Sequence, residues 1–182
     1  MNEKDVACSK RMAAMPAQNG PAGEAASITL MLLRLGTRWF GVDVRAIEEV
    51  ALKGEVTRVP KAPSHILGVT SLRGRLVTVV GLQQMIGGHD MLSREISATP
   101  PRLVVVRDGE YEMAVEAEGI HGMTEYVPAA EPGPDRPPGS PAFVREEFDW
   151  HGNRVSLLDT PILIATAARL AGILSPSEGV QP

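Results

Sequence analysis

Two hairpin-like segments of similar sequence restrict this chain to a fold that is rich in β-strands. Residues 72–80 (LRGRLVTVV) align with residues 150–158 (WHGNRVSLL), with a glycine at the same place in each turn and apolar residues after it. Upstream, residues 40–47 (FGVDVRAI) align with residues 113–120 (MAVEAEGI). The spacing between the aligned blocks differs by a few residues, and chance similarity is the alternative explanation. Taken as a repeat, the order strand, strand, turn, strand, hairpin occurs twice and predicts two small, similar β-barrels.

The chain is long enough to build such a fold without disulfide or metal staples. Its 182 residues allow one domain or two small lobes that share a core. A folded part of roughly 150 residues would bury about 68–70% of the surface of its unfolded chain. Apolar residues make up 43% of the sequence but aromatic residues only 4%, so the core must consist mainly of Val, Ile, Leu and Met.

Local patterns place strands along most of the middle of the sequence. Strands are expected within residues 27–36, 38–44, 55–60, 66–82, 102–120 and 143–159. Turns at Arg73-Gly74 and Asp108-Gly109 divide two of these segments into hairpins. Residues 44–52 are expected to form a short helix or a turn, because their apolar residues recur at helical spacing.

The end of the folded part carries the signals of an α-helix. Asp159 or Thr160 can cap this helix, and Pro161 suits its first turn. Low apolar periodicity and high Ala, Gly, Pro and charge content predict disorder at both ends of the chain. The expected organisation is a disordered arm at 1–26, a folded domain at 27–174 with subdomains at about 27–88 and 101–158 and a helix at about 159–172, and a disordered tail at 175–182.

Charge and cysteine content limit the partners and the compartment. The net charge of −4 argues against a nucleic-acid-binding protein, which normally presents a basic face to phosphates. Cys8 is the only cysteine and cannot form an internal disulfide, which fits a reducing cytoplasm. No apolar segment of the sequence approaches the length that spans a bilayer, so we expect no direct insertion into a membrane.

No group of residues in the sequence predicts catalysis, a metal site or a cofactor. The four histidines lack ligand spacing, and one cysteine argues against a structural zinc site. The glycine motifs that bind phosphates and dinucleotides are absent, as is the G-x-S-x-G nucleophile motif. Glu48 and Glu49 are adjacent, so on a helix their side chains diverge and form no acid–base pair. We therefore expect neither an enzyme nor a cofactor, which leaves protein binding through a surface.

Arg73 is the residue that best fits such a surface. It lies at the tip of the most strand-like hairpin, within residues 66–82, where no other side chain could act as its catalytic partner. An arginine in a turn is most often simply solvated, and contact with another protein is the alternative.

The most specific part of the sequence is a series of short motifs within residues 40–82. FGVD, AIEEV, VTRVP, ILGV and LRG follow one another in this order. Together they resemble the CheW family, the coupling proteins of bacterial chemosensory arrays, and the resemblance extends over about residues 28–172. It implies a mainly β fold of two small five-stranded SH3-like β-barrels packed together, with a C-terminal α-helix.

The resemblance also implies a function and a set of site residues. A CheW-like adaptor couples the cytoplasmic tip of a methyl-accepting chemoreceptor to the regulatory domain of a CheA-type histidine kinase. Ile47 and Arg73 match places implicated in receptor or kinase contact, and Glu49, Val56 and Gly68 match places implicated in kinase coupling. Such a protein would be cytoplasmic and associated with membrane receptor arrays only through its partners. Arg73 would then lack a catalytic partner because its partner is another protein.

Two alternatives to a coupling protein of chemotaxis stay open, and departures from the family pattern lead to the first. The first hairpin ends in VTVVGL, with Gly81 where the family usually has the aspartate that the second repeat keeps as Asp159. An auxiliary CheW-like protein of a motility or developmental pathway is one alternative. A small-barrel protein that binds nucleic acid is the remote one.

Overall fold

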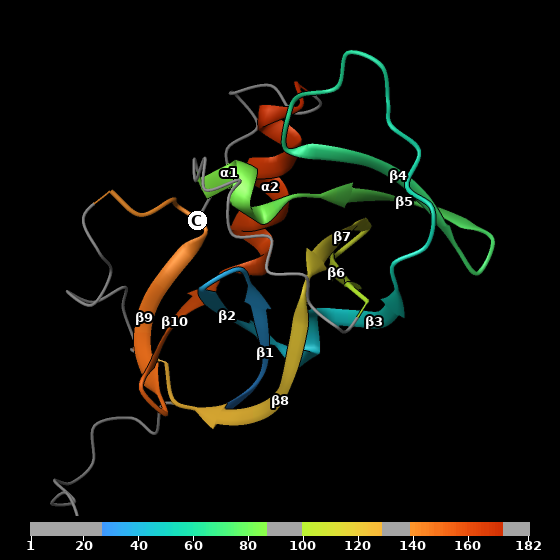
Figure 1. Ribbon diagram of the computed structural model, residues 1–182. Helices are drawn as coiled ribbons and strands as arrows, with labels where there is room; N and C mark the ends of the chain where they lie inside the picture. Colours follow the sequence, from blue (N-terminus) through green and yellow to red (C-terminus); the bar gives the residue numbers. More distant parts are fainter. Residues whose placement is uncertain (1–26, 87–99, 129–138, 173–182) are drawn as a thin grey trace, which may run out of the picture.

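A computed structural model describes residues 27–86, 100–128 and 139–172 (Figure 1). The arm expected at 1–26 and the tail expected at 175–182 lie outside these residues. The described elements are β1 (Ile28–Leu35), β2 (Arg38–Asp43), the 3-10 helix η1 (Val44–Ala46), β3 (Ile47–Leu52), β4 (Ile66–Leu72), β5 (Arg75–Val80), α1 (Leu82–Ile86), β6 (Arg102–Asp108), β7 (Tyr111–Ala117), β8 (Gly119–Tyr126), β9 (Val144–Trp150), β10 (Asn153–Leu158) and α2 (Thr160–Leu170).

The strands form two five-stranded sheets that lie side by side, with α2 near their junction (Figure 1). Sheet A has the order β8-β1-β2-β10-β9, and sheet B has the order β3-β6-β7-β5-β4. The expected fold class is confirmed: the chain is mainly β, with two SH3-like sheets and a C-terminal helix. The hydrogen-bonded ladders are not closed into complete barrels, since each sheet keeps two edge strands.

The two sheets do not coincide with the two halves of the sequence. Each sheet takes its central hairpin from one repeat and its other three strands from the other repeat, so β1 and β2 join β8, β9 and β10, while β6 and β7 join β3, β4 and β5. The units expected at about 27–88 and 101–158 are therefore interleaved in space. The bounds of these two units follow the order of the strands in the sequence. Pairing between strands of different repeats decides which strands share a sheet.

Strand registers support the repeat itself. The parallel pair Val79–Ala114 in sheet B occupies the place of Leu157–Gly41 in sheet A, as the sequence alignment requires. The two hairpin turns also match, with φ of 49° and 81° at Arg73-Gly74 and of 50° and 79° at His151-Gly152. Two-residue loops with positive φ at both positions are type I′ turns, whose twist suits the flanking strands. The two repeats therefore form equivalent elements.

The main hydrophobic core lies between the sheets and beneath α2. It includes Leu33 and Phe40 from sheet A, Val104 and Val115 from sheet B, and Leu163 from α2, all at most 2% exposed. A second cluster lies on the other face of sheet B, formed by Val77, Val79, Leu103, Val105 and Ala114. The central strands are thus buried on both faces, which explains their continuous apolar runs.

Helix α2 begins where its capping residues predict. The Asp159 side chain accepts a hydrogen bond from the Ile162 amide at 3.0 Å, and Pro161 occupies the first turn. His65, which is 4% exposed, places its Nε2 3.1 Å from the Ala167 carbonyl oxygen and so connects the end of the β3–β4 loop to α2.

Three local expectations need correction. Residues 44–52 form a 3-10 turn and then strand β3, whose side chains alternate between half-buried and exposed. Residues 55–60 contribute only a bridge at Thr57 rather than a strand. The β6–β7 turn is Gly109-Glu110, one residue later than expected. The local pattern misled in residues 44–52, because the apolar Val50 and Leu52 lie on the exposed face of β3 while Glu49 lies on its half-buried face.

The expected strand segment ends at residue 120, whereas strand β8 continues to Tyr126. Most of its side chains are exposed or half-buried, and glycines interrupt its apolar pattern. It forms because it pairs with β1, with Ile120 opposite Leu33. Within the described ranges, no helix is long and apolar enough to cross a membrane.

Candidate protein-binding site

The predicted site residues all belong to sheet B or to the loops that border it. Ile47 and Glu49 lie on β3, Val56 follows β3, Gly68 lies on β4, and Arg73 lies in the β4–β5 turn. They come from both edge strands of the sheet, because β3 and β4 are its first and last strands. The fold thus places residues up to 26 positions apart in the sequence around one sheet, and it brings Arg73 into contact with Glu49.

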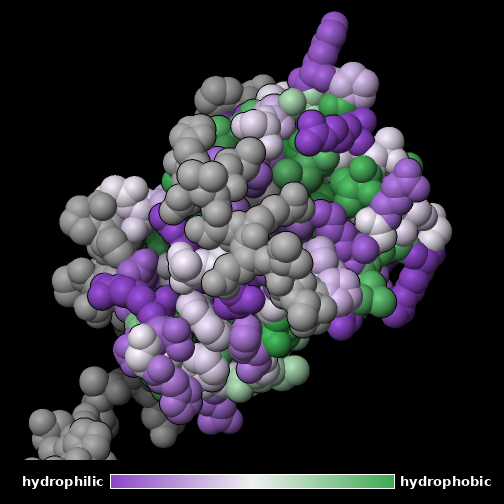
Figure 2. Space-filling view, in the orientation of Figure 1, coloured by the Kyte–Doolittle hydropathy of each residue, from purple (hydrophilic) through white to green (hydrophobic). Residues whose placement is uncertain are grey.

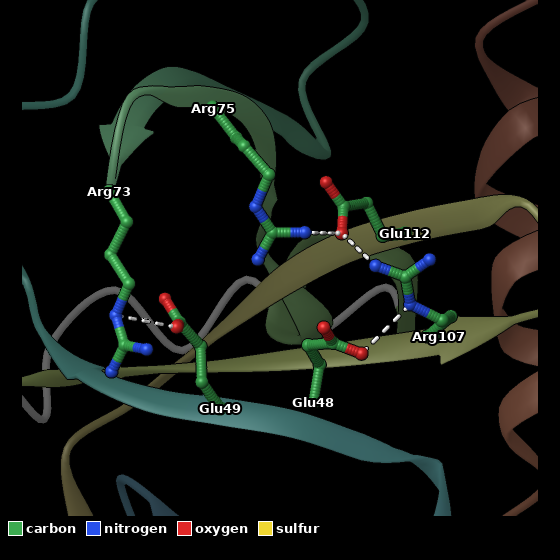
Figure 3. A network of polar contacts seen from close by, with 6 residues as sticks. All are labelled: Glu48, Glu49, Arg73, Arg75, Arg107 and Glu112. Carbon is green, nitrogen blue, oxygen red and sulfur yellow. Dashed lines mark hydrogen bonds and ion pairs between the residues drawn. The ribbon is translucent and has the colours of Figure 1, made fainter.

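Arg73 and Glu49 form an ion pair across this end of the sheet (Figure 3). The Arg73 Nε atom lies 3.2 Å from Glu49 Oε2, and the two side chains are 83% and 11% exposed. A pair with so exposed a cation contributes only about 0–1 kcal/mol to stability. Its main effect is to hold a solvent-facing guanidinium above β3, where its remaining donors can meet a partner.

A second set of ion pairs fixes the strands beneath Arg73 (Figure 3). Glu112 Oε2 receives Arg75 at 2.8 Å and Arg107 at 3.0 Å, and the Arg107 Nε atom lies 2.9 Å from Glu48 Oε2. The adjacent glutamates of β3 therefore pair with different arginines, and Glu48 lies where the register between β3 and β6 shifts. Nothing in this arrangement resembles an acid–base pair.

Gly68 and Val56 hold the β3–β4 loop against β4. Gly68 has φ of 150°, and an added Cβ would collide with the Thr57 carbonyl oxygen and lie 2.8 Å from Val56 Cγ1. The close approach allows Thr57 and Val69 to exchange two backbone hydrogen bonds of 2.8 and 2.9 Å. Val56 packs against the second core cluster. These two residues shape the site and present little side-chain surface of their own.

Ile47 is half-buried and packs against the main core, at the point where β3 leaves η1. The preceding turn is capped by Asp43, whose carboxylate accepts hydrogen bonds from the Arg45 backbone and side chain. The bond from the Arg45 side chain lowers the pKa of Asp43, while partial burial opposes this shift. The charged pair thereby fixes where β3 begins.

Exposed apolar side chains accompany the charged ones, and sequence reasoning missed them. Leu76 on β5 is 77% exposed, and Val50 and Leu52 on β3 are 40% and 57% exposed. Figure 2 shows exposed apolar residues among hydrophilic ones on the side of the molecule where β4 and β5 lie. The exposure of Leu76 could have been predicted from the sequence. Side chains alternate along a strand, so if Val77 points inward, its neighbour Leu76 must point outward.

Metal binding finds no support in the described part of the chain. No group of three or more His, Cys, Asp or Glu side chains there is placed to hold a metal ion. Charged and apolar groups on a strand edge and a hairpin tip are instead the ordinary components of a protein-binding surface.

Comparison with known proteins gives a consistent result. The family model of the CheW-like domain matches residues 29–168. The chain is 32% identical over 109 residues to the chemotaxis protein CheW of Klebsiella aerogenes, covering 60% of this chain and 63% of that protein. It is 44% identical over 45 residues to the chemotaxis protein CheW of Thermotoga maritima, covering 25% of this chain and 30% of that protein. The matches thus span less than two thirds of the length of these curated relatives.

The fold is also similar to a solved structure, that of the scaffolding protein TtCheW from Thermoanaerobacter tengcongensis. The TM-score is 0.60 at 18% identity, and the similarity covers 78% of this chain and 90% of that one. At this identity the likeness supports the two-sheet fold alone. Because the family model covers most of the chain, the chain belongs to the CheW-like domain family.

Proposed function

We propose that this protein is a non-enzymatic adaptor that couples the cytoplasmic tip of a chemoreceptor to the regulatory domain of a CheA-type histidine kinase. The observation that carries the proposal is Arg73, a highly exposed guanidinium held by Glu49 at the positions that the family resemblance assigns to partner contact. The chain would work in the cytoplasm and reach receptor arrays through its partners.

The site residues would divide the work between contact and support. Arg73 would donate charge-assisted hydrogen bonds to a partner carboxylate, and Glu49 would hold it in place beforehand. Ile47, Val56 and Gly68 would keep β3, its following loop and β4 in position. Preorganisation of this kind improves affinity because less side-chain freedom is lost on binding.

Arg73→Glu tests this proposal. The variant should unfold within about 0.5 kcal/mol of wild type, because an exposed turn side chain contributes little to stability. It should bind a kinase regulatory domain or a receptor fragment at least about tenfold more weakly, since charge reversal removes the contact and adds repulsion. Isothermal titration calorimetry measures the binding, and urea unfolding measures the stability.

His151→Glu is the matched control. His151 occupies the equivalent type I′ turn in sheet A, and it is likewise exposed. The His151→Glu variant should bind both fragments as tightly as wild type. Wild-type affinity of Arg73→Glu for both fragments would show that Arg73 is only a solvated turn residue. An equal loss in the two variants would show a general charge effect instead of a site.

An auxiliary role in a motility or developmental pathway is the second candidate, and Gly81 favours it. Asp159 caps α2, whereas α1 follows Gly81, which has no side chain that could accept a hydrogen bond. The family's usual aspartate at this place would offer α1 a cap that glycine lacks. Binding to a kinase of a flagellar system, measured beside kinases of other chemosensory systems, would separate the two roles.

A further inference from the structure

Besides the β4–β5 turn with Arg73, the β3–β4 loop also carries exposed charges at its tip. The adaptor function proposed above gives these charges no role. We define the basic loop tip as Arg58, Val59 and Lys61. All three side chains are exposed, and Val59 is 43% exposed. The tip follows directly on Thr57, the residue that bridges to β4.

Both ends of this loop are anchored. At its start, Thr57 and Val69 exchange backbone hydrogen bonds, and the Thr70 hydroxyl donates to the Glu55 carbonyl at 2.8 Å. At its end, the Ile66 amide donates to the Pro63 carbonyl at 2.9 Å. The tip is therefore flanked on both sides by hydrogen-bonded residues.

Lys61 adopts a backbone conformation that is unfavourable for lysine. The Ala62 amide donates to the Val59 carbonyl at 3.2 Å, which closes a turn with Pro60 and Lys61 at its centre. Lys61 has φ of 62°, which a type II turn requires at this position and which glycine or asparagine normally supplies. Strain retained in an anchored loop is a reason to look for a function of the side chain that it displays.

The charges of the tip differ from those of the arginines around the β4–β5 turn. Arg73, Arg75 and Arg107 each form an ion pair with a glutamate. Neither Arg58 nor Lys61 forms one with any described residue. Two unneutralised cations beside an exposed valine on a chain of net charge −4 form a local positive site on an acidic protein.

We propose that the basic loop tip docks against an acidic, partly apolar patch on the partner protein that binds sheet B. This inference rests on the proposed function, because it assigns the tip to the same partner-binding surface as Val56 and Gly68. Charge complementarity favours a protein partner, because a small acidic patch on a protein matches two localised cations. The net negative charge of this chain opposes binding to extended polyanions such as nucleic acid or an anionic membrane. Val59 adds an apolar contact at the centre of the tip.

Three variants of the full chain test the inference against the kinase regulatory domain. The double variant Arg58→Glu/Lys61→Glu should bind at least about tenfold more weakly, and its binding should depend less on salt than that of wild type. Lys61→Gly removes a charge and the backbone strain together. It should therefore weaken binding while its melting temperature equals or exceeds that of wild type, an outcome that no general destabilisation produces.

Arg38→Glu is the control, since Arg38 is exposed on sheet A and forms no ion pair with a described residue. It should bind like wild type. If wild type binds the kinase domain and the tip variants bind equally well, the tip has no docking role while the adaptor proposal stands. If wild type binds neither the kinase domain nor a receptor fragment, both fall.

A polyanion assay tests the choice of occupant. Wild type should bind neither phosphatidylserine vesicles nor single-stranded oligonucleotides at low salt. Binding to either that the double variant loses would identify the tip as a site for polyanions and overturn the assignment to a protein partner.

Discussion

Gly68→Ala offers a sharp test of how sheet B holds its site. An alanine Cβ would collide with the Thr57 carbonyl oxygen and lie 2.8 Å from the Thr57 carbonyl carbon. Backbone cannot yield as a flexible side chain can, so the β3–β4 loop must move away from β4. The movement breaks the two hydrogen bonds between Thr57 and Val69.

The expected cost follows from two contributions. Holding alanine at φ of 150° costs about 1–3 kcal/mol. Each lost backbone hydrogen bond costs about 0.5–1.5 kcal/mol. The sum is about 2–6 kcal/mol, a large fraction of the roughly 5–15 kcal/mol by which a domain is stable.

Gly74→Ala is the matched control. Gly74 also has positive φ, 81°, but no atom outside its immediate neighbours lies within 4 Å of an added Cβ. It should lose only about 1–2 kcal/mol, from backbone strain alone. Urea unfolding followed by far-ultraviolet circular dichroism gives both free energies, provided the m-values agree. Equal losses within about 0.5 kcal/mol would refute the claim that the close approach of Thr57 matters.

The comparison also bears on function. Gly68 has no side chain, so a loss of kinase binding in folded Gly68→Ala cannot come from a lost contact at residue 68. It would come from displacement of the loop that carries Val56 and the basic loop tip. Binding measured well below the unfolding transition separates this displacement from unfolding.

Two further predictions concern caps. Asp159→Ala should lower the free energy of unfolding by about 1 kcal/mol in urea, because it leaves the Ile162 amide without its acceptor, and an unchanged value would show that α2 needs no cap. Arg45 lowers the pKa of Asp43, so the stability from this pair is present above the ordinary value of 3.8 and is lost as pH falls further. Asp43→Asn should therefore lose less stability than wild type on acidification below about pH 4, as unfolding across pH measures, and parallel pH profiles would contradict the linkage.

The sequence was informative at two hairpin turns and at one helix cap, all of which are local features. The glycine after Arg73 and the glycine after His151 mark type I′ turns, whose geometry depends on two adjacent residues. The cap at Asp159 is equally local, and its helix begins as expected. In each case the energy that decides the structure comes from residues within a few positions of one another.

Prediction failed where pairing over long distances decides the structure. Strand β8 is mostly exposed and lacks an apolar pattern, yet it forms because β1 offers it an edge. β3 likewise pairs with β6, which begins 50 positions after β3 ends. The exchange of strands between the repeats follows from these pairings, and no local propensity encodes them. For the site, motifs found Arg73 and Glu49, but not the ion pair between them or the exposed Leu76.

The equivalence of the two sheets sharpens the argument that sheet B carries the site. At the hairpin end of sheet A, the positions that correspond to Glu112 and Arg73 hold Trp39 and His151. Trp39 lies against the rings of His121 and Trp150, with centroids 4.4 and 5.5 Å apart. One backbone plan thus ends in packed aromatic rings on sheet A and in a set of ion pairs on sheet B. Stability requires only that side chains pack at the hairpin end of each sheet, and sheet A shows that aromatic rings are sufficient for this. The exposed arginine on sheet B is therefore not a requirement of the fold, which favours a role for it in binding.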